Sequence, residues 1–65
     1  MRVITVFDPD MSQVVACAVV NEDTAERAVE MFREAAKGHY RIFNVVADSL
    51  SDAVDYVRSE TADTD

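Results

Sequence analysis

Few side chains in this sequence have the chemistry of a catalytic or metal-binding site: Asp8, Asp10, His39 and Tyr40 are the first to consider. Asp8 and Asp10 stand in the segment FDPD, and carboxylate oxygens are the ligands that Mg²⁺ prefers. No third carboxylate follows close by in the sequence, and aspartates beside a proline are already explained by a turn. A lone histidine without a positioned partner is no acid–base site. We therefore expect no metal site, no cofactor and no catalytic residues, and we predict that the protein is not an enzyme.

Cys17 is the only cysteine of the chain, which excludes an intrachain disulfide. A reactive thiolate needs a cationic neighbour or a helix N-terminus. The surrounding segment VVACAVV, residues 14–20, supplies neither. Cys17 is accordingly predicted to be a small buried apolar residue.

The composition limits the classes of partner. The chain has 13 acidic and 6 basic residues and a formal net charge of -7, so nucleic acid repels it and direct DNA or RNA binding is disfavoured. An apolar fraction of 49% argues against disorder. The sequence shows neither a signal peptide nor the roughly 20 apolar residues that a membrane helix requires. We expect no membrane association and a cytoplasmic protein.

The elements that must position these residues follow from periodicity and from turn residues. β-Branched and aromatic residues predict strands at 2–7, 14–20 and 40–46, and the first two form a hairpin closed by a turn around Pro9. Apolar residues at three- and four-residue steps predict a first helix that begins near Asn21 or Asp23 and ends at Gly38. A second helix begins at Asp48 or Ser49, where one of these side chains caps its first turn.

The order β-β-α-β-α predicts an α+β fold. We expect a two-layer sandwich in which two helices cover one face of a three-stranded mixed sheet. The sequence leaves two strand orders open, 2-1-3 and 1-2-3. Residues 1–58 are expected to form a single domain, and residues 59–65 a flexible acidic tail.

With both helices on one face, the apolar strand 14–20 predicts an uncovered apolar surface on the other. An antiparallel sheet with one solvated face normally alternates polar and apolar residues, and this strand does not. Its burial by another chain contributes on the order of 5 to 10 kcal/mol, as much as the stability of a small domain. We therefore predict a homodimer or a tight partner complex whose interface contains Val15, Cys17, Val19, Phe43 and Val45. The alternative is that the tail or the hairpin loop covers this face.

Acidic residues recur along the outer sides of both predicted helices. If the helices are neighbours, these carboxylates form one acidic surface that suits a basic protein partner and accelerates the encounter with it. The alternative is an ordinary solvated helix surface, interrupted by Arg27, Arg33, Lys37 and Arg58. The expected surface contains Glu22, Asp23, Glu26, Glu30, Glu34, Asp48, Asp52 and Asp55.

Two functions are consistent with these features. The first is a small acidic inhibitor or regulator that docks on the nucleic-acid-binding surface of another protein, as nucleic-acid mimics directed by phages at host defence nucleases do. The second is a dimeric structural or assembly module that acts through the apolar sheet face. An enzyme would need several chains to assemble a site, because no cluster of His, Ser, Cys or Lys is present in the sequence.

Overall fold

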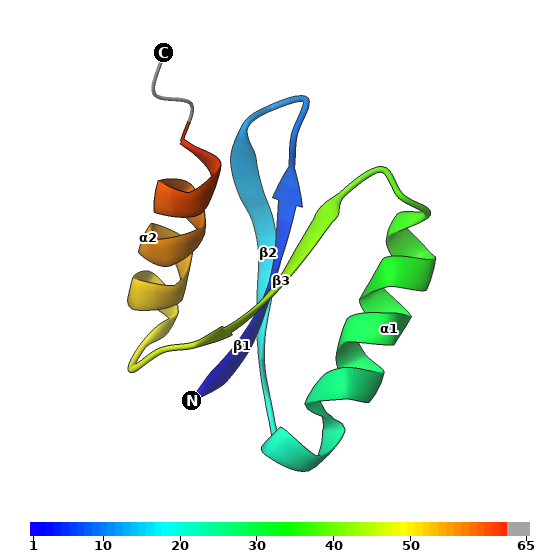
Figure 1. Cartoon of the computed structure of the whole chain (residues 1–65), viewed down its shortest axis with the longest axis vertical. Helices are drawn as coiled ribbons and strands as arrows, with labels where there is room; N and C mark the ends of the chain where they lie inside the picture. Colours follow the sequence, from blue (N-terminus) through cyan, green and yellow to red (C-terminus); the bar gives the residue numbers. More distant parts are fainter. Residues whose placement is uncertain (63–65) are drawn as a thin grey trace.

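A computed structural model describes residues 1–62 and has the α+β fold expected from the sequence (Figure 1). The strands are β1 (Arg2–Asp8), β2 (Gln13–Val20) and β3 (Arg41–Val46), and the helices are α1 (Ala25–Ala36) and α2 (Leu50–Thr61). A short 3-10 helix, η1 (Glu22–Thr24), precedes α1. The element order β-β-α-β-α is confirmed.

The strand order is β2-β1-β3, which is one of the two orders that the sequence left open. β1 pairs antiparallel with β2 on one side and antiparallel with β3 on the other. The expected mixed sheet is therefore wrong, because β2 and β3, which run in the same direction, are separated by β1 and do not pair. Both β2 and β3 are edge strands.

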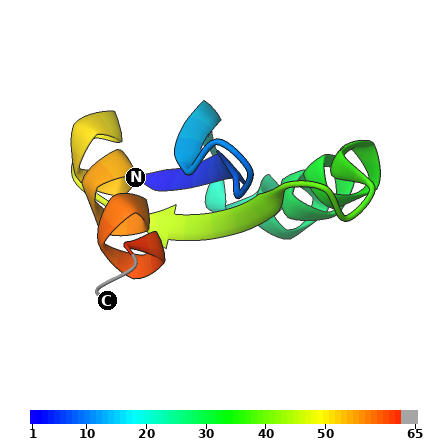
Figure 2. The ribbon, with the colours of Figure 1, turned by 90° about the horizontal axis from the view of Figure 1, so that it is seen from above.

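The two helices lie on opposite faces of the sheet, which corrects the expected two-layer arrangement with both helices on one face. Figure 2 shows α2 and α1 on either side of the strands. The physical reason lies in β1, whose side chains alternate between two apolar sets: Val3 and Phe7 point to one face, and Ile4 and Val6 to the other. All four are buried. A strand that is apolar on both faces needs a covering layer on each.

The core on the α2 side is a single cluster. Val3, Phe7 and Val45 of the sheet pack against Ala53 and Val57 of α2. On the other face, α1 contacts β3 and β1, and it buries its own residues Ala25, Val29 and Ala36. β1 is thus the centre of the molecule, with one helix on each side.

The observed helix ends agree in part with those expected from the sequence. The Ser49 hydroxyl accepts a hydrogen bond from the Asp52 amide at 3.1 Å, so the predicted cap of α2 is confirmed. Gly38 has a left-handed φ of 79°, as a C-terminal stop requires, and Lys37 before it is also left-handed. Asn21 stands at the start of η1 but makes no side-chain capping bond.

The second helix is longer than expected. α2 continues to Thr61, whose hydroxyl donates to the Val57 carbonyl at 2.7 Å, so residues 59–61 are helical and do not belong to a tail. Residues 63–65 of the predicted tail lie outside the described residues.

Candidate functional site

The β2 edge of the sheet is the most unusual surface of the described chain. β2 has the sequence QVVACAVV, eight residues with no charge, no proline and no glycine, and most of its side chains are exposed. Val15 is 46% and Val19 is 55% exposed, and Cys17 is exposed as well. The expectation that Cys17 is buried is wrong, because β2 lies at the edge of the sheet and not at its centre.

An edge strand presents unpaired backbone N–H and C=O groups along its outer side. Natural proteins protect such edges with charged residues, prolines, bulges or a covering segment. β2 has one of these devices. Its register with β1 shifts between Val6 and Phe7, so Val15 is the additional residue of a bulge near the hairpin. From Ala16 to Val20 the pairing is regular, and this part of the edge is left free to pair with another strand.

One side of α1 carries a second apolar surface. Ala28, Met31, Phe32 and Ala35 line a shallow hollow of about 280 Å³, and Met31 is 64% exposed. On the sheet face below, α1 packs mainly on β3 and β1. The same face of β2 carries Ala16, which is exposed, and Ala18 and Val20, which are half-buried.

A second hollow shows which edge of the sheet each side of α1 faces. Glu26, Glu30 and Arg33 of α1 line that hollow together with Asn44 of β3, so this side of the helix faces the β3 edge. At 100° per residue, Ala28 and Phe32 project from the opposite flank of the helix. That flank faces the β2 edge. The hollow on α1 and the free edge of β2 thus face the same side of the molecule.

The residues expected at a sheet interface lie in two different places in the structure. Val15, Cys17 and Val19 are exposed on β2. Phe43 and Val45 belong to the face covered by α2: Phe43 is half-buried against the core cluster, and Val45 is only 6% exposed. These two residues are not on a free surface, because the second helix takes the face that was expected to be open.

The eight acidic residues expected on the binding surface are all exposed, but they do not form one surface. Because α1 and α2 lie on opposite faces of the sheet, their carboxylates point to two separate sides of the molecule. One set lies along η1 and α1, and the other lies at the start of α2. The first set is Glu22, Asp23, Glu26, Glu30 and Glu34, and the second is Asp48, Asp52 and Asp55.

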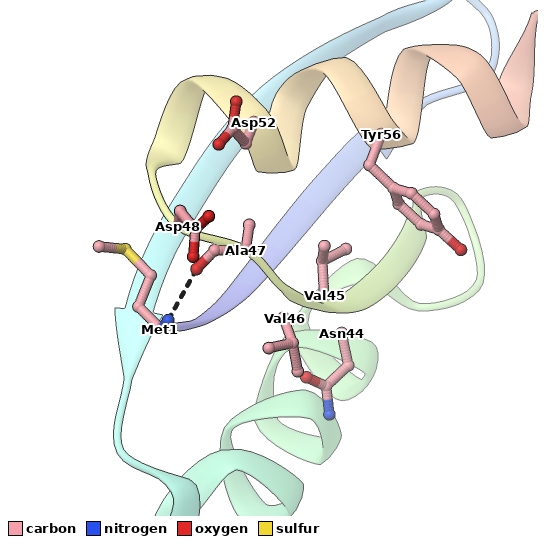
Figure 3. Close-up of a pocket in the computed structure, with 8 residues that line it drawn as sticks. All are labelled: Met1, Asn44, Val45, Val46, Ala47, Asp48, Asp52 and Tyr56. Carbon is pink, nitrogen blue, oxygen red and sulfur yellow. Dashed lines mark hydrogen bonds between the residues drawn. The ribbon is translucent and has the colours of Figure 1, made fainter.

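A larger hollow of about 500 Å³ lies where β3 leads into α2. The Met1 ammonium group at this hollow donates a hydrogen bond to the Ala47 carbonyl at 2.7 Å. Figure 3 shows that the carboxylate of Asp52, the phenol of Tyr56 and the amide of Asn44 point in different directions. These polar groups do not converge on a common point, so the hollow has no arrangement for acid–base chemistry.

The hairpin turn brings together a group that the sequence spacing did not reveal. Asp8, Asp10 and His39 offer ligand atoms within 4.8 Å of one another, and His39 Nε2 lies 3.7 Å from an Asp10 carboxylate oxygen. Asp8 is buried and accepts backbone N–H bonds from Asp10 at 2.9 Å and Met11 at 3.4 Å. That carboxylate therefore forms the turn, as expected, and Asp10 and His39 are exposed side chains that face each other.

Sequence reasoning missed the contribution of α1 to the apolar edge. Met31 does not belong to the apolar stripe that buries α1, yet it stands beside Phe32 on the same flank as Ala28 and Ala35. An apolar residue one step outside the core stripe of an amphipathic helix is the signal that marks such a flank.

No family model matches this chain, and no significant match was found among curated proteins or solved structures. Among residues 1–62, neither α-helix has the length and apolar character needed to span a membrane.

Proposed function

We propose that this protein is a non-enzymatic interaction module that binds another polypeptide through the edge of β2. The observation that carries the proposal is the exposed, uncharged strand from Ala16 to Val20 at the edge of an antiparallel sheet. Addition of a strand there satisfies backbone groups and buries apolar side chains in one step.

The surrounding surface supports this proposal. The apolar flank of α1 faces the same side of the molecule as the β2 edge and enlarges the surface that a partner can cover. Apolar patches of this kind mark interaction sites on soluble proteins. The polar groups that line the larger hollow at the start of α2 do not converge (Figure 3), which favours binding over catalysis. We place the module in the cytoplasm, where an exposed thiol such as that of Cys17 stays reduced.

The experiment compares three tagged baits expressed in the same host: the wild type, Val19→Lys and Val46→Lys. Val46 is a matched control because it is an exposed valine, 67% exposed, on the other edge strand. Lysine at an edge blocks strand pairing. We expect Val19→Lys to lose the polypeptides, including untagged copies of the chain itself, that the wild type and Val46→Lys retain. Equal capture by all three baits would refute the β2 edge as the binding surface.

The acidic row on α1 supports a second candidate function, an inhibitor or regulator that docks on a basic, nucleic-acid-binding surface of another protein. Glu26, Glu30 and Glu34 are exposed at four-residue steps, and within residues 1–62 none of them forms an ion pair. Like charges at this spacing destabilise a helix by a few tenths of a kcal/mol per pair. The row therefore lowers helix stability, which favours a role in binding.

A charge-reversal variant tests this second candidate. Glu26, Glu30 and Glu34 are changed together to Lys, and capture is measured at low and high salt. Loss of a basic partner from this variant, with salt-sensitive capture by the wild type, is the expected result. The same partner captured equally by both proteins at both salt concentrations would exclude acidic docking through α1.

A further inference from the structure

We infer that the polypeptide that pairs with the β2 edge is a second copy of this chain, in a two-fold arrangement that joins two sheets into one. The inference rests on the proposed function, since it names the occupant of the same edge. In this dimer β2 of each copy runs antiparallel to β2 of the other. The three-stranded sheets become one continuous sheet of six strands, and β3 remains at both outer edges.

The charge distribution favours a second copy. The chain has a net charge of -7, so two copies repel each other wherever their charged surfaces meet. β2 is the one strand of the three without a charged residue, because β1 contains Arg2 and Asp8 and β3 contains Arg41. An uncharged strand offers no attraction for a basic or acidic partner and no repulsion against itself.

The strand is also complementary to itself. A two-fold interface puts the same surface of both copies in contact, so each position must tolerate its symmetry mate. Valine, alanine and cysteine are small or β-branched, and they pack well across a strand pair in any combination. Ala18 is the middle residue of the free segment Ala16–Val20, so the axis of a pair that overlaps over this segment passes through a small side chain.

A second possible self-pairing joins β2 of one copy to β3 of the next. Such a head-to-tail contact leaves a free β2 and a free β3 at the ends, and it continues into an open filament. The side of β3 near α1 is polar, since Arg2 Nη1 donates to Asn44 Oδ1 at 3.4 Å and Glu26 and Glu30 line the neighbouring hollow. Pairing of β2 with β2 buries two uncharged strands and closes on itself.

The test is the mass of the purified full chain in solution, measured by sedimentation equilibrium over a dilution series. The wild type and Val46→Lys are expected to be dimers at micromolar concentration. Val19→Lys and Cys17→Lys, which place lysines on the paired strands, are expected to raise the dimer Kd about 100-fold or more. Circular dichroism establishes that each variant is folded, and two separate β2 positions keep the test valid if one variant fails to fold.

The outcomes separate the inference from the proposed function. A wild type that stays monomeric at several hundred micromolar overturns the dimer, whereas capture of another protein that depends on Val19 would still support binding at the β2 edge. A dimer that Val46→Lys dissociates and Val19→Lys leaves intact overturns the assignment of the interface to β2. Masses that grow without limit on concentration indicate head-to-tail pairing and also contradict the two-fold arrangement.

Discussion

β1 and β2 are neighbours in one sheet and have similarly apolar sequences, but their environments are opposite. Val3, Ile4, Val6 and Phe7 of β1 are all buried, whereas most side chains of β2 are exposed. β1 lies in the middle of the sheet, with α2 on one face and α1 on the other. The comparison teaches that apolar composition predicts a strand without revealing its place in the sheet, and that an apolar edge strand requires an explanation that a central one does not.

The largest expected effect is the difference in stability between shortening a side chain of β1 to alanine and shortening one of β2. Ile4 is fully buried, with 0% exposed, and Ile4→Ala is expected to lower the free energy of unfolding by about 3 kcal/mol. Val19→Ala, on the exposed strand, is expected to change it by less than about 0.5 kcal/mol. Urea denaturation of dilute protein, where self-association is negligible, measures both values. Similar losses at the two sites would mean that β2 contributes to the core of a single chain.

The next effect concerns a polar group in the buried strand. Thr5 is fully buried between Cys17 and Phe43, and its hydroxyl has no hydrogen-bond partner among the described residues. Thr5→Val removes the unsatisfied hydroxyl, so the free energy of unfolding is expected to rise by about 1 kcal/mol.

The paired position on β2 provides the control for Thr5. Cys17→Ser introduces a hydroxyl of similar size at the exposed residue opposite Thr5, where water can solvate it. Thermal unfolding of dilute protein is expected to show a higher Tm for Thr5→Val and little change for Cys17→Ser. A lower Tm for Thr5→Val would show that the hydroxyl is satisfied in the native state.

An effect of about the same size is expected at the helix starts that hold the two covering layers on β1. Ser49→Ala removes the hydroxyl that caps α2 and is expected to cost about 1 kcal/mol of unfolding free energy. Asn21→Ala is the matched change before η1 and α1, where the side chain makes no capping bond, and it is expected to cost less. Chemical denaturation compares the two variants, and a larger loss for Asn21→Ala would reverse the assignment of the caps.

The smallest effect concerns the ion pair that links the start of β1 to the segment after β2. Arg2 Nη2 lies 2.7 Å from Glu22 Oε2, and both side chains are partly exposed. Solvent-exposed pairs of this kind contribute about 0.5 kcal/mol, and salt screens them. Glu22→Gln is expected to lower stability by about that amount at low salt and by less at 1 M NaCl. A loss that does not depend on salt would point to a packing role for Glu22.

The local elements of this fold were predictable from the sequence, and their arrangement was not. β-Branched runs, the glycine after α1 and Ser49 before α2 located the strands and the helix ends, because these signals act within a few residues. The side of the sheet on which each helix packs depends on contacts between distant segments. The two apolar faces of β1 indicate two covering layers. The same pattern in β2 led to the wrong expectation that Cys17 is buried.

The candidate site was predictable to a similar degree. Val15, Cys17 and Val19 were identified because an uninterrupted apolar strand exceeds what a small domain can bury. Phe43 and Val45 lie under α2, a position that depends on the helix arrangement. The flank of α1 around Met31 was missed, because the direction of that flank is fixed by the packing of α1 on β3. The proximity of Asp10 and His39 likewise arises from two loops that are distant in the sequence.

Hydrogen exchange of the backbone amides of β1 and β2, measured at several protein concentrations, tests the central claim most directly. The amides of β1 are paired on both sides and are expected to be protected at every concentration. The outward-facing amides between Ala16 and Val20 are expected to exchange rapidly in dilute protein and to become protected as the concentration rises. Exchange at these amides that remains fast at all concentrations, with no partner polypeptide able to slow it, would contradict the account of β2 as a pairing edge.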